Sequence, residues 1–150
     1  MGKKLEGLQK VVSGEVPEAP IWQLVGFKTV AIAEGESVLE IETSGRHANP
    51  MGTLHGGVLC DVADAAMGTA FATTLADDES FTTLELKINF LRPVWADKLR
   101  AVGKVVKRGR HVGMVECDVT NSKGDLVARS SSTCMVLRGE LAAGRETPGA

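Results

Sequence analysis

The sequence predicts an α+β fold in which one long helix packs against an antiparallel sheet of about six strands. The stretch from about Gly56 to Leu75 is long enough for a helix of about five turns and is rich in small apolar residues. Residues 37–44 and 82–93 alternate polar and apolar side chains with the period of two that marks a strand. One helix layer on one sheet buries the apolar face of both, and 150 residues suit a single domain.

The N-terminal half begins with a separate segment, residues 1–20, which we expect to form a short helix followed by a turn at Pro17 and Pro20. A first strand is predicted around residues 27–33 and a second at residues 37–44. In the second strand Leu39 and Ile41 point to one face and Glu40 and Glu42 to the other. Residues 45–52 contain Pro50 and form a loop.

The predicted long helix is apolar on most of its surface, so other elements must surround it. Its small residues would let a curved sheet approach closely; they are Ala63, Ala65, Ala66, Gly68 and Ala70. Four strand candidates follow at residues 82–93, 98–109, 111–124 and 125–137, with a hairpin loop at residues 121–125. The domain therefore spans residues 21–138, and the Gly-, Ala- and Pro-rich residues 139–150 form a flexible tail.

Composition excludes several classes of function. The net charge is −2 and no basic block occurs, which argues against nucleic acid as a partner. No apolar run has the length of a bilayer span, and the N-terminus lacks the apolar stretch of a signal peptide, so we expect a cytoplasmic protein without a membrane partner. Three widely spaced cysteines and three histidines show no metal-ligand spacing, so we expect no metal.

One motif resembles a known family. Residues 49–57 read Asn-Pro-Met-Gly-Thr-Leu-His-Gly-Gly, Asp64 follows seven residues after the second glycine, and residues 90–93 read Phe-Leu-Arg-Pro. Over roughly residues 20–138 the chain resembles the hot-dog-fold acyl-CoA thioesterases of the phenylacetate-degradation (PaaI-like) group. The resemblance implies a sheet wrapped around a central helix, and hydrolysis of a small aromatic or medium-chain acyl-CoA. It also implies a homodimer, and a homotetramer beyond it, with the active sites between subunits. No separate cofactor is implied, because CoA is part of the substrate.

The first half of the motif supplies groups for the thioester carbonyl. Gly56 and Gly57 lie at the predicted helix start, where backbone N–H groups lack partners and the helix dipole is positive. Gly57 N–H would therefore polarise the carbonyl, with Gly56 against the substrate. Alternatively, both glycines only let the chain turn tightly into the helix. The resemblance makes His55 a residue of the same pocket, which either assists at the carbonyl or holds the loop.

Asp64 is the predicted catalytic carboxylate. Apolar surroundings should raise its pKa, and it would act as a general base on water or attack the carbonyl as a nucleophile. The alternative is a carboxylate that bonds to a sheet backbone group or to solvent. By the resemblance, Asn49 orients water or substrate, although Asn-Pro is also a good turn starter. Thr83 matches a residue that some relatives place near the water from the other subunit, and Gly68 stands where some relatives carry Thr.

The phosphates of CoA would need cations and hydroxyl donors. Lys107 and Arg110 flank a compact basic turn that suits phosphate contact, and Ser131 could add a hydroxyl. The alternative is that this turn is simply solvated. Two other functions stay open: a non-catalytic acyl-CoA binding module, and a hot-dog dehydratase or hydratase of acyl thioesters. Hydratase relatives carry Asp-x-x-x-x-His, whereas Gly68 and Thr69 follow Asp64 here.

Overall fold

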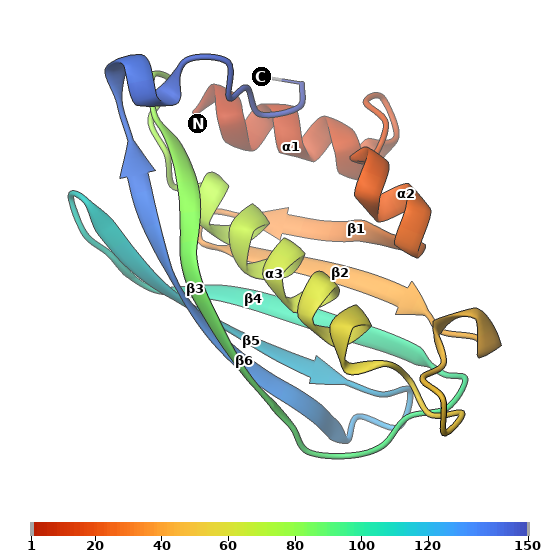
Figure 1. Cartoon of the computed structure of the whole chain (residues 1–150). Helices are drawn as coiled ribbons and strands as arrows, with labels where there is room; N and C mark the ends of the chain where they lie inside the picture. The colour runs from red at the N-terminus through yellow and green to blue at the C-terminus, as the bar shows by residue number, and fades with distance from the viewer. Residues whose placement is uncertain (1, 150) are drawn as a thin grey trace.

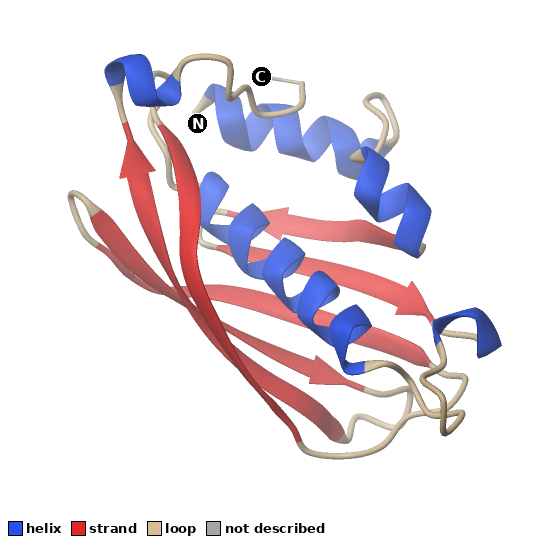
Figure 2. Cartoon of the chain, in the orientation of Figure 1, coloured by secondary structure: helices blue, strands red, loops and turns tan. Residues whose placement is uncertain are grey.

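A computed structural model describes residues 2–149. At its centre one curved sheet carries a long helix on its concave face (Figure 1). The antiparallel sheet has the strand order β1-β2-β4-β5-β6-β3. Its strands are β1 Phe27–Ala33, β2 Glu36–Glu42, β3 Ser80–Phe90, β4 Lys98–Arg108, β5 Val112–Thr120 and β6 Leu126–Leu137. The helix is α3, Gly56–Ala72. This arrangement of one sheet and a long helix confirms the predicted α+β hot-dog fold (Figure 2).

Close contact between α3 and the sheet depends on small residues on both sides. Ala66 is fully buried in the middle of α3, and a side-chain carbon at Gly103 of β4 would come within 2.4 Å of the Ala66 carbonyl oxygen. Ser37 of β2 donates a hydrogen bond of 2.6 Å to the same oxygen. The helix therefore rests directly on the backbone of the central strands, as the small residues in its sequence predict.

The helix α3 ends three residues before the predicted end at Leu75. The Thr73 hydroxyl donates to the Ala70 carbonyl and accepts from the Gly35 N–H, and the Thr74 hydroxyl donates to the Phe71 carbonyl. Threonine hydroxyls compete with the backbone for helical carbonyls, so these two residues cap and end the helix. The difference matters little for Asp64, which lies in the middle of α3.

The N-terminal segment contains two helices, α1 at Lys3–Ser13 and α2 at Pro20–Val25. The first was predicted, whereas the second, between the predicted turn and the first predicted strand, was not. Six residues are too few for a helical period to show. Its signals were nevertheless present, because Pro20 opens the helix and Gly26 ends it in a left-handed conformation, with φ at 99°.

The C-terminal residues 139–149 turn back toward the N-terminal helix α1 (Figure 1). After the short 3-10 helix η2 at Gly139–Ala142, Thr147 accepts a hydrogen bond of 3.4 Å from the Lys4 ammonium. Gly149 lies against the backbone of Gly7. Both terminal segments, which the sequence placed outside the domain 21–138, therefore lie against its helix side.

The strand β3 forms one edge of the sheet and, within the part of the chain that the structure describes, pairs only with β6. A bulge between Thr83 and Glu85 changes the direction in which its side chains point. Thr83 pairs with buried Cys134, whereas Glu85 bonds Thr133, which alternates with the buried residues of β6. The bulge thus directs Thr83 toward α3 in the middle of the open edge.

Candidate active site

The motif around His55 forms the start of α3. The His55 Nδ1 atom accepts a hydrogen bond of 2.9 Å from the Gly57 N–H, and the Val58 N–H donates to the His55 carbonyl. His55 is therefore the N-cap of the helix. Because Nδ1 is the acceptor, the neutral ring carries its proton on Nε2. In this state the N–H that we predicted for the thioester carbonyl is already occupied by the imidazole.

Gly56 and Gly57 are required by space rather than by backbone angle. A side-chain carbon at Gly56 would lie 2.9 Å from the ring of Phe90, and one at Gly57 would lie 2.8 Å from the His55 ring. Neither glycine has a positive φ. Small residues at both positions therefore let the Phe90 ring and the His55 ring approach the helix start.

Asn49 organises the loop before the helix. Its side-chain oxygen accepts from the N–H groups of Met51 and Thr53, and its amide nitrogen donates to the Thr53 hydroxyl at 2.7 Å. All these bonds lie within the loop, which corresponds to the turn-forming alternative for Asn49. Asn49 also lines a groove of about 410 Å³ together with Gly56, Phe90 and Arg92. This groove lies between the start of α3 and residues 90–94.

His47 supports the loop of the candidate site, a role that the sequence did not indicate. Its Nδ1 atom accepts from the Ser44 N–H at 3.1 Å, and its Nε2 atom lies 2.7 Å from the Val25 carbonyl oxygen. The His55 N–H donates to the His47 carbonyl at 2.9 Å. His47 thus ties the end of α2 to the loop that delivers His55. No spacing in the sequence relates Val25, His47 and His55, so only the fold could reveal this link.

Asp64 and Thr83 meet across the gap between α3 and the edge strand β3. The Thr83 hydroxyl donates to Asp64 Oδ1 of the same chain over a long distance of 3.5 Å. Burial raises the pKa of the Asp64 carboxyl, the Thr83 hydrogen bond opposes that rise, and the nearby charge of Asp61 adds to it. Asp64 is nevertheless an exposed residue of the single chain. Within residues 2–149 its carboxylate bonds the Thr83 side chain and no backbone group of the sheet.

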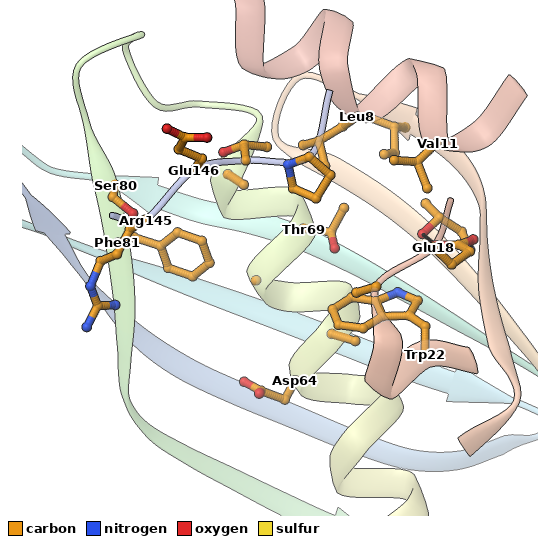
Figure 3. A pocket seen from close by; sticks show the side chains of 18 of the residues that line it. Leu8, Val11, Glu18, Trp22, Asp64, Thr69, Ser80, Phe81, Arg145 and Glu146 are labelled. Carbon is orange, nitrogen blue, oxygen red and sulfur yellow. Dashed lines mark hydrogen bonds between the residues drawn. The ribbon is translucent and has the colours of Figure 1, made fainter. Parts of the chain in front are cut away.

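Two hollows meet at Asp64. A shallow groove of about 300 Å³ runs between α3 and β3 and is lined by Cys60, Asp61, Thr83 and Leu84–Leu86 together with Asp64. On the other side lies a cavity of about 330 Å³. Figure 3 shows the Trp22 and Phe81 rings on opposite sides of this cavity, with Thr69 between them and Asp64 at one end. No sequence pattern indicated aromatic walls, because Trp22 and Phe81 lie 59 positions apart.

The structure does not bring the predicted phosphate-binding residues to Asp64 within one chain. Lys107 and Arg110 are exposed around the turn between β4 and β5, near the C-terminal end of α3, whereas His55 lies at its other end (Figure 1). The helix between these ends is about 25 Å long. Ser131 is partly exposed on β6 and alternates with buried Ser130 and Ser132, so it faces away from the helix.

Within residues 2–149 no group of three metal-ligating side chains lies together, and no helix there is long and apolar enough to cross a membrane. The site instead combines a helix N-terminus, a carboxylate of raised pKa and an apolar cavity on a hot-dog fold.

The sequence profile of the thioesterase superfamily matches residues 51–128, which is more than half of the chain. A protein of Saccharolobus solfataricus that carries the provisional name of esterase is 32% identical over 82% of this chain and 87% of its own length. The chain therefore belongs to the thioesterase superfamily. The resemblance to the PaaI-like group of hot-dog thioesterases is confirmed, and the protein is a thioester hydrolase.

Solved structures agree with this assignment. A phenylacetic acid degradation-related protein of Ralstonia eutropha is 30% identical, with a TM-score of 0.78 over 86% of this chain and 98% of its own. The Escherichia coli PaaI protein shares the fold, with a TM-score of 0.80 and 21% identity over 90% of this chain and 96% of its own. Human acyl-coenzyme A thioesterase 13 is 24% identical over 89% of this chain and 96% of its own.

Proposed function

We propose that this protein hydrolyses the thioester of an acyl-CoA to the free acid and CoA. The observation that carries the proposal is Asp64, a carboxylate of raised pKa at the end of an apolar cavity beside an edge-strand groove. An acyl group suits the cavity, and a carboxylate at its end reaches the carbonyl region of such a substrate. The names of relatives support this substrate class, since they include an acyl-coenzyme A thioesterase and a 1,4-dihydroxy-2-naphthoyl-CoA hydrolase.

In the proposed reaction Asp64 takes a proton from water, and the water oxygen bonds to the carbonyl carbon. The carbonyl oxygen becomes negative and is stabilised by the Gly57 N–H. The C–S bond then breaks and CoA leaves as a thiolate, which takes up a proton from solvent. In the nucleophilic alternative Asp64 bonds to the carbonyl carbon itself, the C–S bond breaks and CoA leaves as a thiolate, and water then hydrolyses the resulting anhydride to the acid and free Asp64. Thr83 and Asn49 orient water and substrate in either case.

The proposed site is shared by two subunits. Within one chain Gly57 and Asp64 are separated by seven residues of helix, or about 10 Å along its axis. A thioester carbonyl must lie about 3 Å from its hydrogen-bond donor, so the Asp64 of a second α3 facing the first helix start closes this gap. The open edge of β3 lies beside Asp64 and offers eleven residues for pairing with a second copy.

This assembly also gives the remaining predicted residues a role. The exposed cations Lys107 and Arg110 suit CoA phosphates if a neighbouring subunit brings them near the site, and Ser131 would add a hydroxyl on the outer face. Pairing of dimers into a homotetramer and a cytoplasmic location complete the proposal. The open β3 edge and the helix geometry support the proposed dimer. The family resemblance supports the proposed tetramer.

The test is release of free thiol from a panel of acyl-CoA esters by the wild-type protein and by Asp64→Ala. We expect turnover of at least one ester and its collapse in a folded Asp64→Ala protein. Tight binding of acyl-CoA without turnover would support a binding module instead. Addition or loss of water in the acyl chain with the thioester intact would support a hydratase or dehydratase. Full activity in Asp64→Ala would overturn the mechanism.

A further inference from the structure

The cavity beside Asp64 runs along one face of α3. Five helix residues line it, and they recur at the spacing of one helical face: Asp64, Ala65, Gly68, Thr69 and Ala72. From Asp64 to Ala72 the helix rises about 12 Å. The cavity is therefore elongated, with the candidate catalytic carboxylate at one end and Ala72 toward the other.

The opposite wall comes from the terminal parts of the chain. Leu8 and Val11 of α1, Trp22 of α2 and residues 145–148 of the C-terminal segment all line the cavity (Figure 3). None of these positions lies within residues 51–128, which the thioesterase superfamily profile matches. The cavity is thus closed by segments outside the profile match, whereas Asp64 lies within it.

The dimensions of the cavity fit one kind of occupant. Its volume of about 330 Å³ is about twice that of an engineered cavity that holds benzene. An extended hydrocarbon chain with C–C bonds of about 1.5 Å gains roughly 1.25 Å per carbon, so about nine or ten carbons fill 12 Å. The large apolar side chains of its wall are Leu8, Val11, Trp22, Ile32 and Phe81. Among the polar wall residues, Glu18 accepts hydrogen bonds from the Thr29 N–H and hydroxyl, and the Thr69 hydroxyl can turn to the carbonyl four residues earlier, at Ala65. The charged residues Arg145 and Glu146 line the cavity from the C-terminal segment.

We propose that this cavity holds the acyl chain of the substrate, and that α1, α2 and residues 145–148 limit it to unbranched chains of about eight to ten carbons. The proposal rests on the acyl-CoA thioesterase function proposed above and assigns the specificity of that same site. Gly68 sets the width of the cavity midway along its length, because a side-chain carbon at Gly68 would lie 3.3 Å from the Phe81 ring. Trp22 closes one side of the cavity.

Gly68 gives a variant that narrows the cavity. It lies four residues beyond Asp64, about 6 Å along the helix, so a butanoyl chain ends near it and an octanoyl chain must pass it. We expect Gly68→Ala to lower the ratio of kcat/KM for octanoyl-CoA to that for butanoyl-CoA at least tenfold. Alanine favours a helix over glycine, so the variant should fold. Gly45→Ala is the matched control, since an added carbon there meets no atom within 4 Å.

Trp22 gives the opposite change. Trp22→Ala removes a wall of the cavity, so we expect the kcat/KM ratio of dodecanoyl-CoA to octanoyl-CoA to rise at least fivefold. Trp95→Ala is its control, because Trp95 is 62% exposed and does not line the cavity. Both ratios are measured by thiol release from even-numbered acyl-CoA esters of two to sixteen carbons.

The outcomes separate the two proposals. Opposite shifts in Gly68→Ala and Trp22→Ala, with both controls unchanged, support the acyl cavity. Turnover of acyl-CoA with neither ratio altered overturns the cavity assignment and leaves the thioesterase proposal standing. A wild-type preference for a compact aromatic acyl group over every straight chain also overturns it. No turnover of any ester overturns the proposed function, and the cavity assignment falls with it.

Discussion

The imidazole of His55 and the backbone N–H of Gly57 form a hydrogen bond of 2.9 Å that caps the helix α3. The proposed mechanism needs the same N–H at the thioester carbonyl, so the two acceptors compete for one donor. The ring must therefore release Gly57 when substrate binds. Since the neutral ring then still carries a proton on Nε2, His55 remains a donor beside the carbonyl.

The role of the Gly57 N–H can be tested with two substitutions that differ mainly in that group. Both Gly57→Pro and Gly57→Ala add a side-chain carbon that displaces the His55 ring, but only proline removes the N–H. Loss of one oxyanion donor lowers kcat by about 10²–10³. We expect a decrease of that size in Gly57→Pro relative to Gly57→Ala in steady-state thiol release. Equal kcat values in the two variants would show that this N–H does not act on the carbonyl.

Replacing Asp64 by Asn should lower kcat/KM by about 10²–10⁴, because a positioned base is lost. A base works only when deprotonated, so wild-type activity should fall as the pH decreases through the pKa of Asp64. Burial raises that pKa above the ordinary value of 3.8. The raised pKa also means that ionised Asp64 does not stabilise the fold, so Asp64→Asn should unfold at an equal or higher temperature at pH 7.

Thr83 should tune this pH profile. Its hydroxyl hydrogen bond lowers the pKa of Asp64 against the effect of burial. Thr83→Val removes that bond with little change of shape, so the acid limb of kcat/KM should move to higher pH, whereas Thr83→Ser should leave the limb in place. The measurement is kcat/KM from pH 3.5 to 8. If Thr83→Val and Thr83→Ser had the same acid limb in kcat/KM, the Thr83 hydrogen bond would have no effect on the pKa of Asp64.

A site shared between subunits predicts rescue by mixing. One chain carries Asp64→Ala and the other Gly57→Pro, and each homodimer is nearly inactive. In a mixed dimer one site holds both defects and the other holds neither. After refolding together at equal concentration, half of the dimers are mixed and half of their sites are intact, so about a quarter of wild-type activity should return. Activity no higher than the mean of the two parent variants would place each site within one chain.

The sequence was sufficient to predict the core fold. Strand alternation such as Leu39 and Ile41 against Glu40 and Glu42 is a local property, and so is the apolar surface of the helix around Ala66. The helix α2 was missed because six residues show no period. The end of α3 was placed too late because the capping by Thr73 depends on Gly35 of a distant hairpin.

The site was only partly predictable. Asp64, His55 and Gly57 stand in a short motif, so the resemblance pointed to them directly. The bond from Asp64 to Thr83 depends on a bulge in the edge strand, and the cavity depends on Trp22 and Phe81 meeting from distant segments. Long-range contacts of this kind leave no spacing in the sequence, and neither does the link from His47 to Val25.

Glu79 holds the end of the sheet together through a partly buried ion network. Its carboxylate pairs with Arg138 and, at 2.8 Å, with Arg108, whose Nε atom is buried and has no hydrogen-bond partner among residues 2–149. Burial alone would raise the pKa of Glu79, but the Ala76 N–H and the two guanidinium groups together hold it below its ordinary value of 4.5. The charge of Glu79 therefore stabilises the fold above that value, and this stabilisation is lost as the pH falls through the lowered pKa.

We expect Glu79→Gln to lower the free energy of unfolding at pH 7 by roughly 3 kcal/mol, because two arginines lose their counter-charge. The deficit should shrink as the pH decreases toward 3, since wild-type Glu79 then becomes neutral as well. Urea unfolding at pH 7, 5 and 3 measures both effects. Glu34→Gln is the control, because Glu34 is exposed and makes no ion pair within residues 2–149. A deficit that stayed constant across this pH range would mean that the shape of Glu79, and not its charge, supports Arg108 and Arg138.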